Sequence, residues 1–160
     1  MLKRVKQTVL QKSGGRFAIV AAKYNGRYVD AMLRAAKKEL TEAKAQQIKV
    51  VRVPGSFEIP VVAAKLAQSH QPPWSAILCF GVIFQGETSH ARHIGDAVSQ
   101  TLARIQVRCL VPVIHGVFVF QNQDQARVRC LGKKHNRGLE AARTALEMAR
   151  VMEGLESLAF

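Results

Sequence analysis

The sequence predicts an α/β protein in which a central four-stranded parallel sheet lies between two layers of helices, as a three-layer αβα sandwich. Short apolar runs of strand length alternate along the chain with segments whose apolar residues recur every three or four positions. The first pattern is typical of buried strands and the second of helices with one apolar face. Strands and helices in strict alternation form parallel sheets that right-handed crossovers cover on both faces.

The first half of the chain predicts two strand and helix pairs. Residues 1–15 are polar and basic and end in Ser-Gly-Gly, which indicates a flexible basic arm ahead of a single domain of residues 16–160. Residues 16–22 and 48–53 are apolar runs of strand length. Ser56, after Pro54 and Gly55, is expected to cap the second helix. The apolar faces of the two helices comprise Val29, Met32, Leu33, Ala36 and Leu40, then Ile59, Val62, Ala63 and Leu66.

The second half continues the alternation. The apolar run 76–80 predicts a third strand, which leads through Gly86 into a helix that Thr88 or Ser89 is expected to cap. Residues 110–118 predict a fourth strand with Pro112 near its start, where a missing N–H does least harm. A short helix over 121–130 and a last helix from Gly138 complete the predicted order.

The charge of the chain is strongly positive. It carries 24 basic and 11 acidic residues, a net charge of +13 and a pI of about 10.3. Such an excess suits an anionic partner. However, the cations are spread along the chain, apart from a denser patch at 127–137, and no nucleic-acid-binding motif accompanies them. An anionic small substrate therefore fits better than a nucleic acid, which stays as the weaker alternative.

Composition also indicates where the protein works. No apolar run approaches the roughly 18 residues that a membrane span needs, and the basic N-terminus lacks the apolar stretch of a secretory signal. The three cysteines are odd in number and lack metal-ligand spacing, and Cys79 and Cys109 are expected to be buried thiols. We therefore expect a cytoplasmic protein without a membrane partner.

The loops that leave the carboxyl ends of the predicted strands gather polar and aromatic groups. In parallel α/β folds these loops meet at one edge of the sheet, where ligands bind. They comprise Tyr24-Asn25, Gly55 to Glu58, Ile83 to His90, and His115 to Phe120. The turn through Gly86 into a helix leaves free N–H groups for an anion, and His90 in the first helical turn can move a proton beside it.

Each of these groups also has a purely structural interpretation. Tyr24 could cover the sheet edge, and Glu58 could serve only the helix dipole. His115 could be a hydrogen-bonded core histidine. The arginines of the 127–137 patch could form a solvated face. The convergence of all these groups on one edge favours a functional site.

Four segments resemble the lumazine synthase family of riboflavin biosynthesis, in its order and spacing. They are Lys23-Tyr24-Asn25, Val53 to Pro60, Gly81 to His90, and Asn136-Arg137-Gly138 followed by Ala145 to Met148. The resemblance implies a flavodoxin-like fold and an enzyme that needs no cofactor or metal. It condenses 5-amino-6-(D-ribitylamino)uracil with 3,4-dihydroxy-2-butanone 4-phosphate to 6,7-dimethyl-8-ribityllumazine, phosphate and water.

The resemblance also implies the role of each residue at the site. His90 transfers protons and Arg129 binds phosphate. Tyr24 stacks on the pyrimidine, and backbone groups around Ile83 read its edge. The substrate-binding set is completed by Asn25, Gly55, Ser56, Phe57, Glu58, Phe84, Gly86, Glu87, Thr88, His115 and Arg137, with ribityl hydroxyls at Ser56 and Glu58 and phosphate at Gly86 to Thr88.

Family members form pentamers, and some build 60-subunit icosahedral shells with active sites between subunits. The resemblance therefore implies that His115, Arg129 and Arg137 reach a neighbour's site. The chain departs from the family pattern at Gln85, at Ala91-Arg92, where an aromatic and an acid are usual, and at His115, where shell-forming members have phenylalanine. These departures keep open an inactive shell protein of the same fold.

Overall fold

The computed structural model describes residues 14–68 and 72–158. Most of the predicted N-terminal arm lies outside the described residues. The strands are β1 (Arg16–Ala22), β2 (Gln47–Val53), β3 (Ala76–Phe84) and β4 (Val113–Phe120). The helices are α1 (Gly26–Glu42), α2 (Ile59–Ala67), α3 (His90–Cys109), α4 (Gln123–Ala126) and α5 (Arg137–Glu156), with a 3-10 turn η1 (Ser56–Glu58) and a π-helical turn η2 (Arg127–Leu131).

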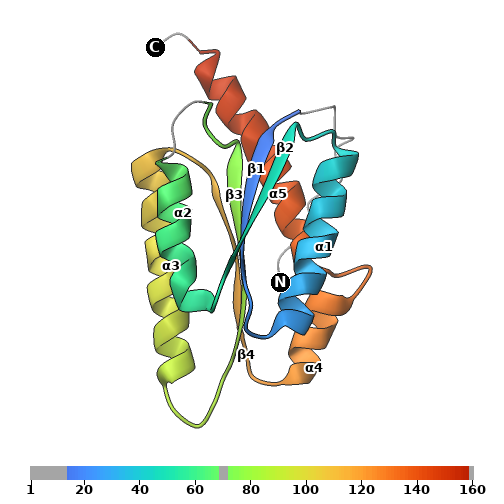
Figure 1. The fold of residues 1–160 in the computed structure, drawn as a ribbon, viewed down its shortest axis with the longest axis vertical. Coiled ribbons are helices and arrows are strands. Elements are labelled where there is room, and N and C mark those ends of the chain that lie inside the picture. The colour runs from blue at the N-terminus through green and yellow to red at the C-terminus, as the bar shows by residue number, and fades with distance from the viewer. Residues whose placement is uncertain (1–13, 69–71, 159–160) are drawn as a thin grey trace.

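The four strands form one all-parallel sheet in the order β2-β1-β3-β4. Figure 1 shows the sheet between two helical layers, with α2 and α3 on one face and α1, α4 and α5 on the other. The predicted α/β sandwich is thereby confirmed. The strands end at the lower edge in Figure 1, which we call the rim, and the loops that follow them meet there.

Two apolar cores hold the layers together. One contains Phe17, Ile19, Met32, Leu40 and Leu146, between the sheet and α1 and α5. The other contains Val20, Ile59, Ile77, Leu102 and Val117, between the sheet and α2 and α3. Because β1 and β3 are buried on both faces, they read as continuous apolar runs in the sequence.

The central strands were predicted well, but the later boundaries were not. Residues 83 and 84, expected in a loop, belong to β3, because β4 pairs with it in register up to Phe84 and Phe120. The fourth strand, predicted over 110–118, runs from Val113 to Phe120, so residues 115–120, which were also placed among the loops, all lie within it. Leu110 instead ends α3 in the left-handed conformation, with φ of 55°. Pro112 does precede the strand directly, as predicted.

The predicted caps also differ from the observed ones. Ser56 does not cap α2: it is buried, and its Oγ faces Gly81, where an added Cβ would lie only 2.3 Å away. Ser89 holds the N-cap position of α3 but makes no capping hydrogen bond. Thr88 Oγ1 instead accepts from the His90 N–H at 3.3 Å. The side chain of Asn136 caps α5, which starts one residue before the predicted Gly138.

The described cysteines are unpaired. Cys79 is buried, as predicted, and burial raises the pKa of its thiol to about 12. Cys109 is only half-buried, whereas Cys130 on η2 is buried, with a thiol pKa raised to about 11 by burial. None of the helices in residues 14–68 and 72–158 combines the length and apolarity that crossing a bilayer requires.

Candidate functional site

The loop after β1 is held by its main chain and presents a bare aromatic ring. The N–H groups of Lys23 and Tyr24 donate to Pro54 O at 3.2 and 3.0 Å, and Lys23 N–H also reaches Val53 O at 2.8 Å. The Tyr24 ring is 69% exposed and lies against Gly55, where an added Cβ would approach Cδ2 to 2.8 Å. An exposed ring on a fixed main chain is a ready surface for stacking on a flat ligand.

Asn25 fastens the same loop to β3. It adopts the left-handed conformation with φ of 55°, and its Nδ2 donates to Val82 O at 2.6 Å. β1 pairs with β3 only as far as Phe80, whereas β3 continues to Phe84. The end of β3 therefore has an open edge on the β1 side, and Asn25 occupies part of it.

The turn after β2 brings a carboxylate to the rim. Glu58 Oε2 accepts from the Gly55 N–H at 2.9 Å, so this oxygen is engaged within the turn. The described residues give Oε1 no partner. The neighbouring Phe57 ring is 62% exposed. The turn therefore offers an exposed aromatic ring and a carboxylate oxygen that has no partner among the described residues.

The loop after β3 is open. Residues 85–90 are all exposed, and at its start Gln85 N–H donates to Phe120 O at 2.8 Å. Its other support is the Gln85 side chain, which donates to Gly86 O and Thr88 O at 3.2 and 3.0 Å. Several main-chain N–H groups here donate no hydrogen bond within the described residues: those of Gly86, Glu87, Thr88, Ser89, Ala91 and Arg92. Free N–H groups at the start of a 20-residue helix attract an anion.

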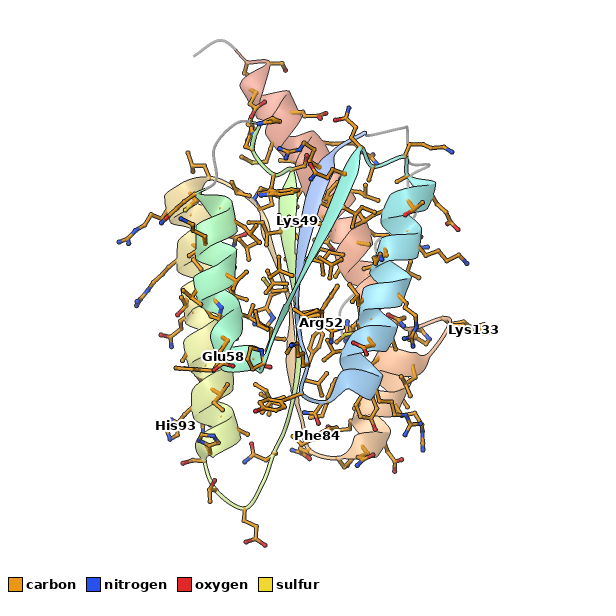
Figure 2. The ribbon with its side chains drawn as sticks, in the orientation of Figure 1. Lys49, Arg52, Glu58, Phe84, His93 and Lys133 are labelled. Atoms are coloured by element: carbon orange, nitrogen blue, oxygen red, sulfur yellow. The ribbon has the colours of Figure 1, made fainter. Side chains whose placement is uncertain are left out.

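Two histidines stand at this helix start. His90 is the first residue of α3 and is exposed, as predicted. His93 lies one turn later, and its Nε2 is 3.1 Å from Ser89 Oγ. Figure 2 places His93 near the lower end of α3, on the side away from the sheet. Imidazole side chains, which can gain or lose a proton near neutral pH, thus adjoin the free N–H groups of the loop.

His115 does not lie at the rim. It pairs with Cys79 in the middle of the sheet, roughly 16 Å up β4 from Phe120 at about 3.3 Å per residue. Ser99 Oγ of α3 lies 2.7 Å from Nε2, and the Val117 N–H donates to Nδ1 at 3.4 Å. Burial lowers the pKa of the imidazole below 6.5, and a hydrogen bond with its own backbone opposes that shift.

Arg129 and Arg137 lie on η2 and at the start of α5. Arg129 is exposed on η2, and the described residues place no carboxylate within ion-pair distance of it. Arg137 pairs with Glu140 at 2.6 Å and lies over the Phe118 ring at 5.9 Å. The neighbouring Arg127 is paired with Asp124 at 2.7 Å. Within residues 14–68 and 72–158, Arg129 is therefore a cation without a carboxylate partner, whereas Arg127 on the same turn has one.

A hollow of about 340 Å³ opens between α3 and β4, the edge strand. Arg92, Asp96 and Ser99 line it from α3, and residues 117–119 line it from β4. It adjoins Gln85 at the start of the open loop.

Sequence reasoning missed two residues near the rim, His93 and Arg52. His93 could have been found from its spacing of three from His90, which places both on one side of a helix. Arg52 donates to Ala21 O and Ala22 O at 3.2 and 3.1 Å and contacts Asp30 at 2.7 Å. Its only signal was a cation within the valine-rich second strand, which does not identify its partners.

Comparisons with known proteins agree with the resemblance. The profile of the 6,7-dimethyl-8-ribityllumazine synthase family matches residues 14–153. A 6,7-dimethyl-8-ribityllumazine synthase of Stenotrophomonas maltophilia (strain R551-3) is 39% identical over 143 residues, which cover 88% of this chain and 90% of the relative. Proteins of the same name from Xanthomonas euvesicatoria pv. vesicatoria (strain 85-10) and Xylella fastidiosa (strain M12) are each 36% identical. These two matches cover 90% and 91% of this chain, and 94% and 95% of the relatives. The chain belongs to the 6,7-dimethyl-8-ribityllumazine synthase family, whose members are transferases of riboflavin biosynthesis.

Proposed function

We propose that the protein condenses 5-amino-6-(D-ribitylamino)uracil with 3,4-dihydroxy-2-butanone 4-phosphate, giving 6,7-dimethyl-8-ribityllumazine, phosphate and water. The observation that carries this proposal is the junction of the two loops. The fixed loop with the bare Tyr24 ring is bonded through Asn25 to β3, and β3 leads directly into the open loop with its free N–H groups and His90. A flat ring and a phosphate can therefore be held side by side.

Each group has a part in this reaction. Tyr24 stacks on the pyrimidine, and the free Oε1 of Glu58 accepts hydrogen bonds from ribityl hydroxyls. The N–H groups of the open loop and the Thr88 hydroxyl bind the phosphate. The butanone phosphate carbonyl accepts the pyrimidine amine to form an imine with loss of one water. Phosphate then departs, and a second water leaves when the ribityl-bearing nitrogen closes the ring on the remaining carbonyl. His90, beside the departing anion, moves the protons that these steps require.

Much of the rate enhancement comes from holding two substrates together. Intramolecular positioning contributes on the order of 7 to 11 kcal/mol to well-oriented reactions. The Tyr24 main chain is fixed before substrate binds, so little ordering is left to the binding step. The phosphate on the open loop fixes the second substrate relative to the first.

We further propose that the complete site forms between two copies of the chain, within pentamers. Three of the proposed site residues support this: His115 lies mid-sheet on an edge strand, Arg129 has no partner within the described part of the chain, and Arg137 lies over Phe118. From these positions they can contribute to the rim of a neighbouring subunit.

Pentamers that associate further would give an icosahedral shell. The cellular location that we propose is the cytoplasm.

Turnover with both substrates, followed by the absorbance of the lumazine product, tests the reaction. His90→Gln is expected to lower kcat by about 100-fold, since general acid–base groups contribute on the order of 10² to 10⁴. Arg129→Ala is expected to raise KM for butanone phosphate by at least about tenfold, because hydrogen bonds to charged groups are worth roughly 1.5 to 3 kcal/mol. Arg127→Ala is the matched control, since Arg127 lies on the same turn and is already paired.

The arrangement between subunits has its own test. At limiting butanone phosphate, His90→Gln and Arg129→Ala chains that are dissociated and reassembled together are expected to exceed the mean activity of the two separate variants. Sites built within one chain would give no such excess. Wild-type protein that forms product no faster than the uncatalysed background would overturn the enzymatic proposal and favour an inactive scaffold of this fold.

A further inference from the structure

We propose that Arg52 is a positioning residue, which holds the loop of Tyr24 and Asn25 in the conformation that receives the pyrimidine substrate. The inference rests on the proposed function, and it assigns a role to a side chain that lies just before the rim on β2. Figure 2 shows Arg52 beside the lower end of α1, with Lys49 higher on the same strand.

Arg52 fastens both ends of the loop at residues 23–25. Its Nε donates to Ala21 O at 3.2 Å and its Nη2 to Ala22 O at 3.1 Å, which are the last two carbonyls of β1. Nη2 also lies 2.7 Å from Asp30 Oδ1, early in α1. One guanidinium therefore contacts the strand that enters the loop and the helix that leaves it.

The Asp30 contact is an ion pair rather than an aligned hydrogen bond. Asp30 Oδ1 is shielded from solvent and accepts no hydrogen bond in good geometry within the described residues. The two side chains are partly exposed, at 32% for Arg52 and 41% for Asp30. Because other atoms of both side chains still contact water, the pair adds little to stability, and its contribution lies in geometry.

The remaining bonds of the loop join it to the turn after Arg52 and to β3. Lys23 and Tyr24 donate to the carbonyls of Val53 and Pro54, the two residues after Arg52, and Asn25 reaches across to Val82. The Tyr24 ring itself is exposed and rests against Gly55. The orientation of the ring is thus set by the hydrogen bonds of its main chain and not by side chains packed around it.

A loop fixed in this way binds more tightly than a mobile one. When only a fraction of the molecules holds the binding-competent conformation, the apparent affinity falls by that fraction. Arg52 therefore raises the affinity for the pyrimidine substrate. It leaves the affinity for butanone phosphate unchanged, because the proposed contacts of that substrate lie on the open loop. Lysine cannot replace it, because a single ammonium lacks the planar fork that reaches two carbonyls and a carboxylate together.

The test compares Arg52→Met with Lys49→Met in the full-length protein. Lys49 is an exposed cation on the same edge strand, so its variant controls for charge and for strand composition. Arg52→Met is expected to raise KM for the ribitylaminouracil about tenfold, in proportion to the lost competent fraction. The values of kcat and of KM for butanone phosphate are expected to stay within about twofold. Arg52→Lys is expected to recover only part of the loss.

Amide hydrogen exchange gives a second readout that needs no turnover. The N–H groups of Lys23 and Tyr24 are expected to exchange about tenfold faster in Arg52→Met, because the loop opens locally. Asp30→Asn keeps the shape of the pair without its charge and is expected to give smaller changes in the same direction. If Arg52→Met does not fold, Asp30→Asn takes its place in both measurements.

The outcomes separate this inference from the proposed function. Unchanged KM for the pyrimidine in an Arg52 variant that has only lost thermal stability would overturn the positioning role. An equal rise in Lys49→Met would overturn it as well, since charge alone would then explain the effect. Absence of turnover in the wild-type protein would overturn the proposed function itself, whatever the Arg52 variants show.

Discussion

The loop after β1 and the loop after β3 meet at one rim but are built in opposite ways. In the first loop, Lys23, Tyr24 and Asn25 all donate hydrogen bonds to neighbouring strands or turns, and the Tyr24 ring is left 69% exposed. In the second, residues 85–90 are exposed and most of their N–H groups donate to nothing within the described residues. The first loop is held at Lys23 and Tyr24, and within the described residues its free N–H groups are those that begin α1, at Asn25, Gly26 and Arg27. The second loop is free along most of its length.

This difference matches the two kinds of ligand proposed for the site. A flat ring gains most from a rigid surface, because stacking depends on orientation. A phosphate gains most from several unpaired donors that converge on it. The two loops can therefore be disturbed separately, and each should affect a different substrate.

The largest expected effect falls on the fixed loop. Asn25→Ala removes the hydrogen bond to Val82 O. It also leaves alanine at a φ of 55°, a left-handed conformation that asparagine tolerates better. Together these changes are expected to destabilise the protein by about 2 to 3 kcal/mol, measured by urea unfolding. Asn25→Gly tolerates the backbone conformation, so it isolates the loss of the amide. Equal stability of Asn25→Ala and wild type would show that the loop is not fastened as described.

In the open loop we expect an effect on binding without an effect on stability. Thr88→Val removes the hydroxyl that accepts from the His90 N–H and that is proposed to reach the phosphate. KM for butanone phosphate is expected to rise about tenfold, which corresponds to roughly 1.4 kcal/mol. Thr88→Ser keeps the hydroxyl and should behave as wild type. A comparable rise for the pyrimidine substrate would contradict the separate roles of the loops.

Two glycines give a matched pair across the loops. A Cβ at Gly55 would lie 2.8 Å from the Tyr24 ring, whereas a Cβ at Gly86 would meet nothing within 4 Å. Gly55→Ala is therefore expected to displace the ring and raise KM for the pyrimidine by about fivefold, since the competent fraction falls. Gly86→Ala should leave that KM and the melting temperature unchanged. Steady-state kinetics of both variants would show the contrast, and its absence would argue against a preset Tyr24.

The smallest expected effect concerns His115, away from both loops. Burial lowers the pKa of this imidazole below its ordinary 6.5, so the folded protein resists its protonation while the unfolded chain accepts the proton. Stability is therefore expected to fall as the pH falls through about 6.5 toward the lower native value. His115→Phe should show a shallower fall between pH 7.5 and 5.5 in urea unfolding. Parallel pH profiles for the two proteins would exclude this contribution.

Much of the site was predictable, because its chemistry lies in short contiguous segments. The positions of Tyr24, Gly55 and Glu58 in loops after strands, and of His90 in the first turn of a helix, follow from the apolar pattern and are observed. His115 shows where this reasoning fails. The strand that carries it extends to Phe120 because β3 pairs with it that far, so His115 lies within the sheet and not at its rim.

By itself, the sequence determined the order of the strands and helices, the two buried central strands and the residue types that follow each strand. These are local properties, since hydrophobic periodicity and turn residues act over a few positions. Only the tertiary structure decided that Ser56 faces Gly81, that Asn25 bonds to Val82, and that Arg52 joins the end of β1 to Asp30. The physical reason is register: Asn25 and Val82 lie 57 positions apart, and their contact depends on how strands align across the sheet.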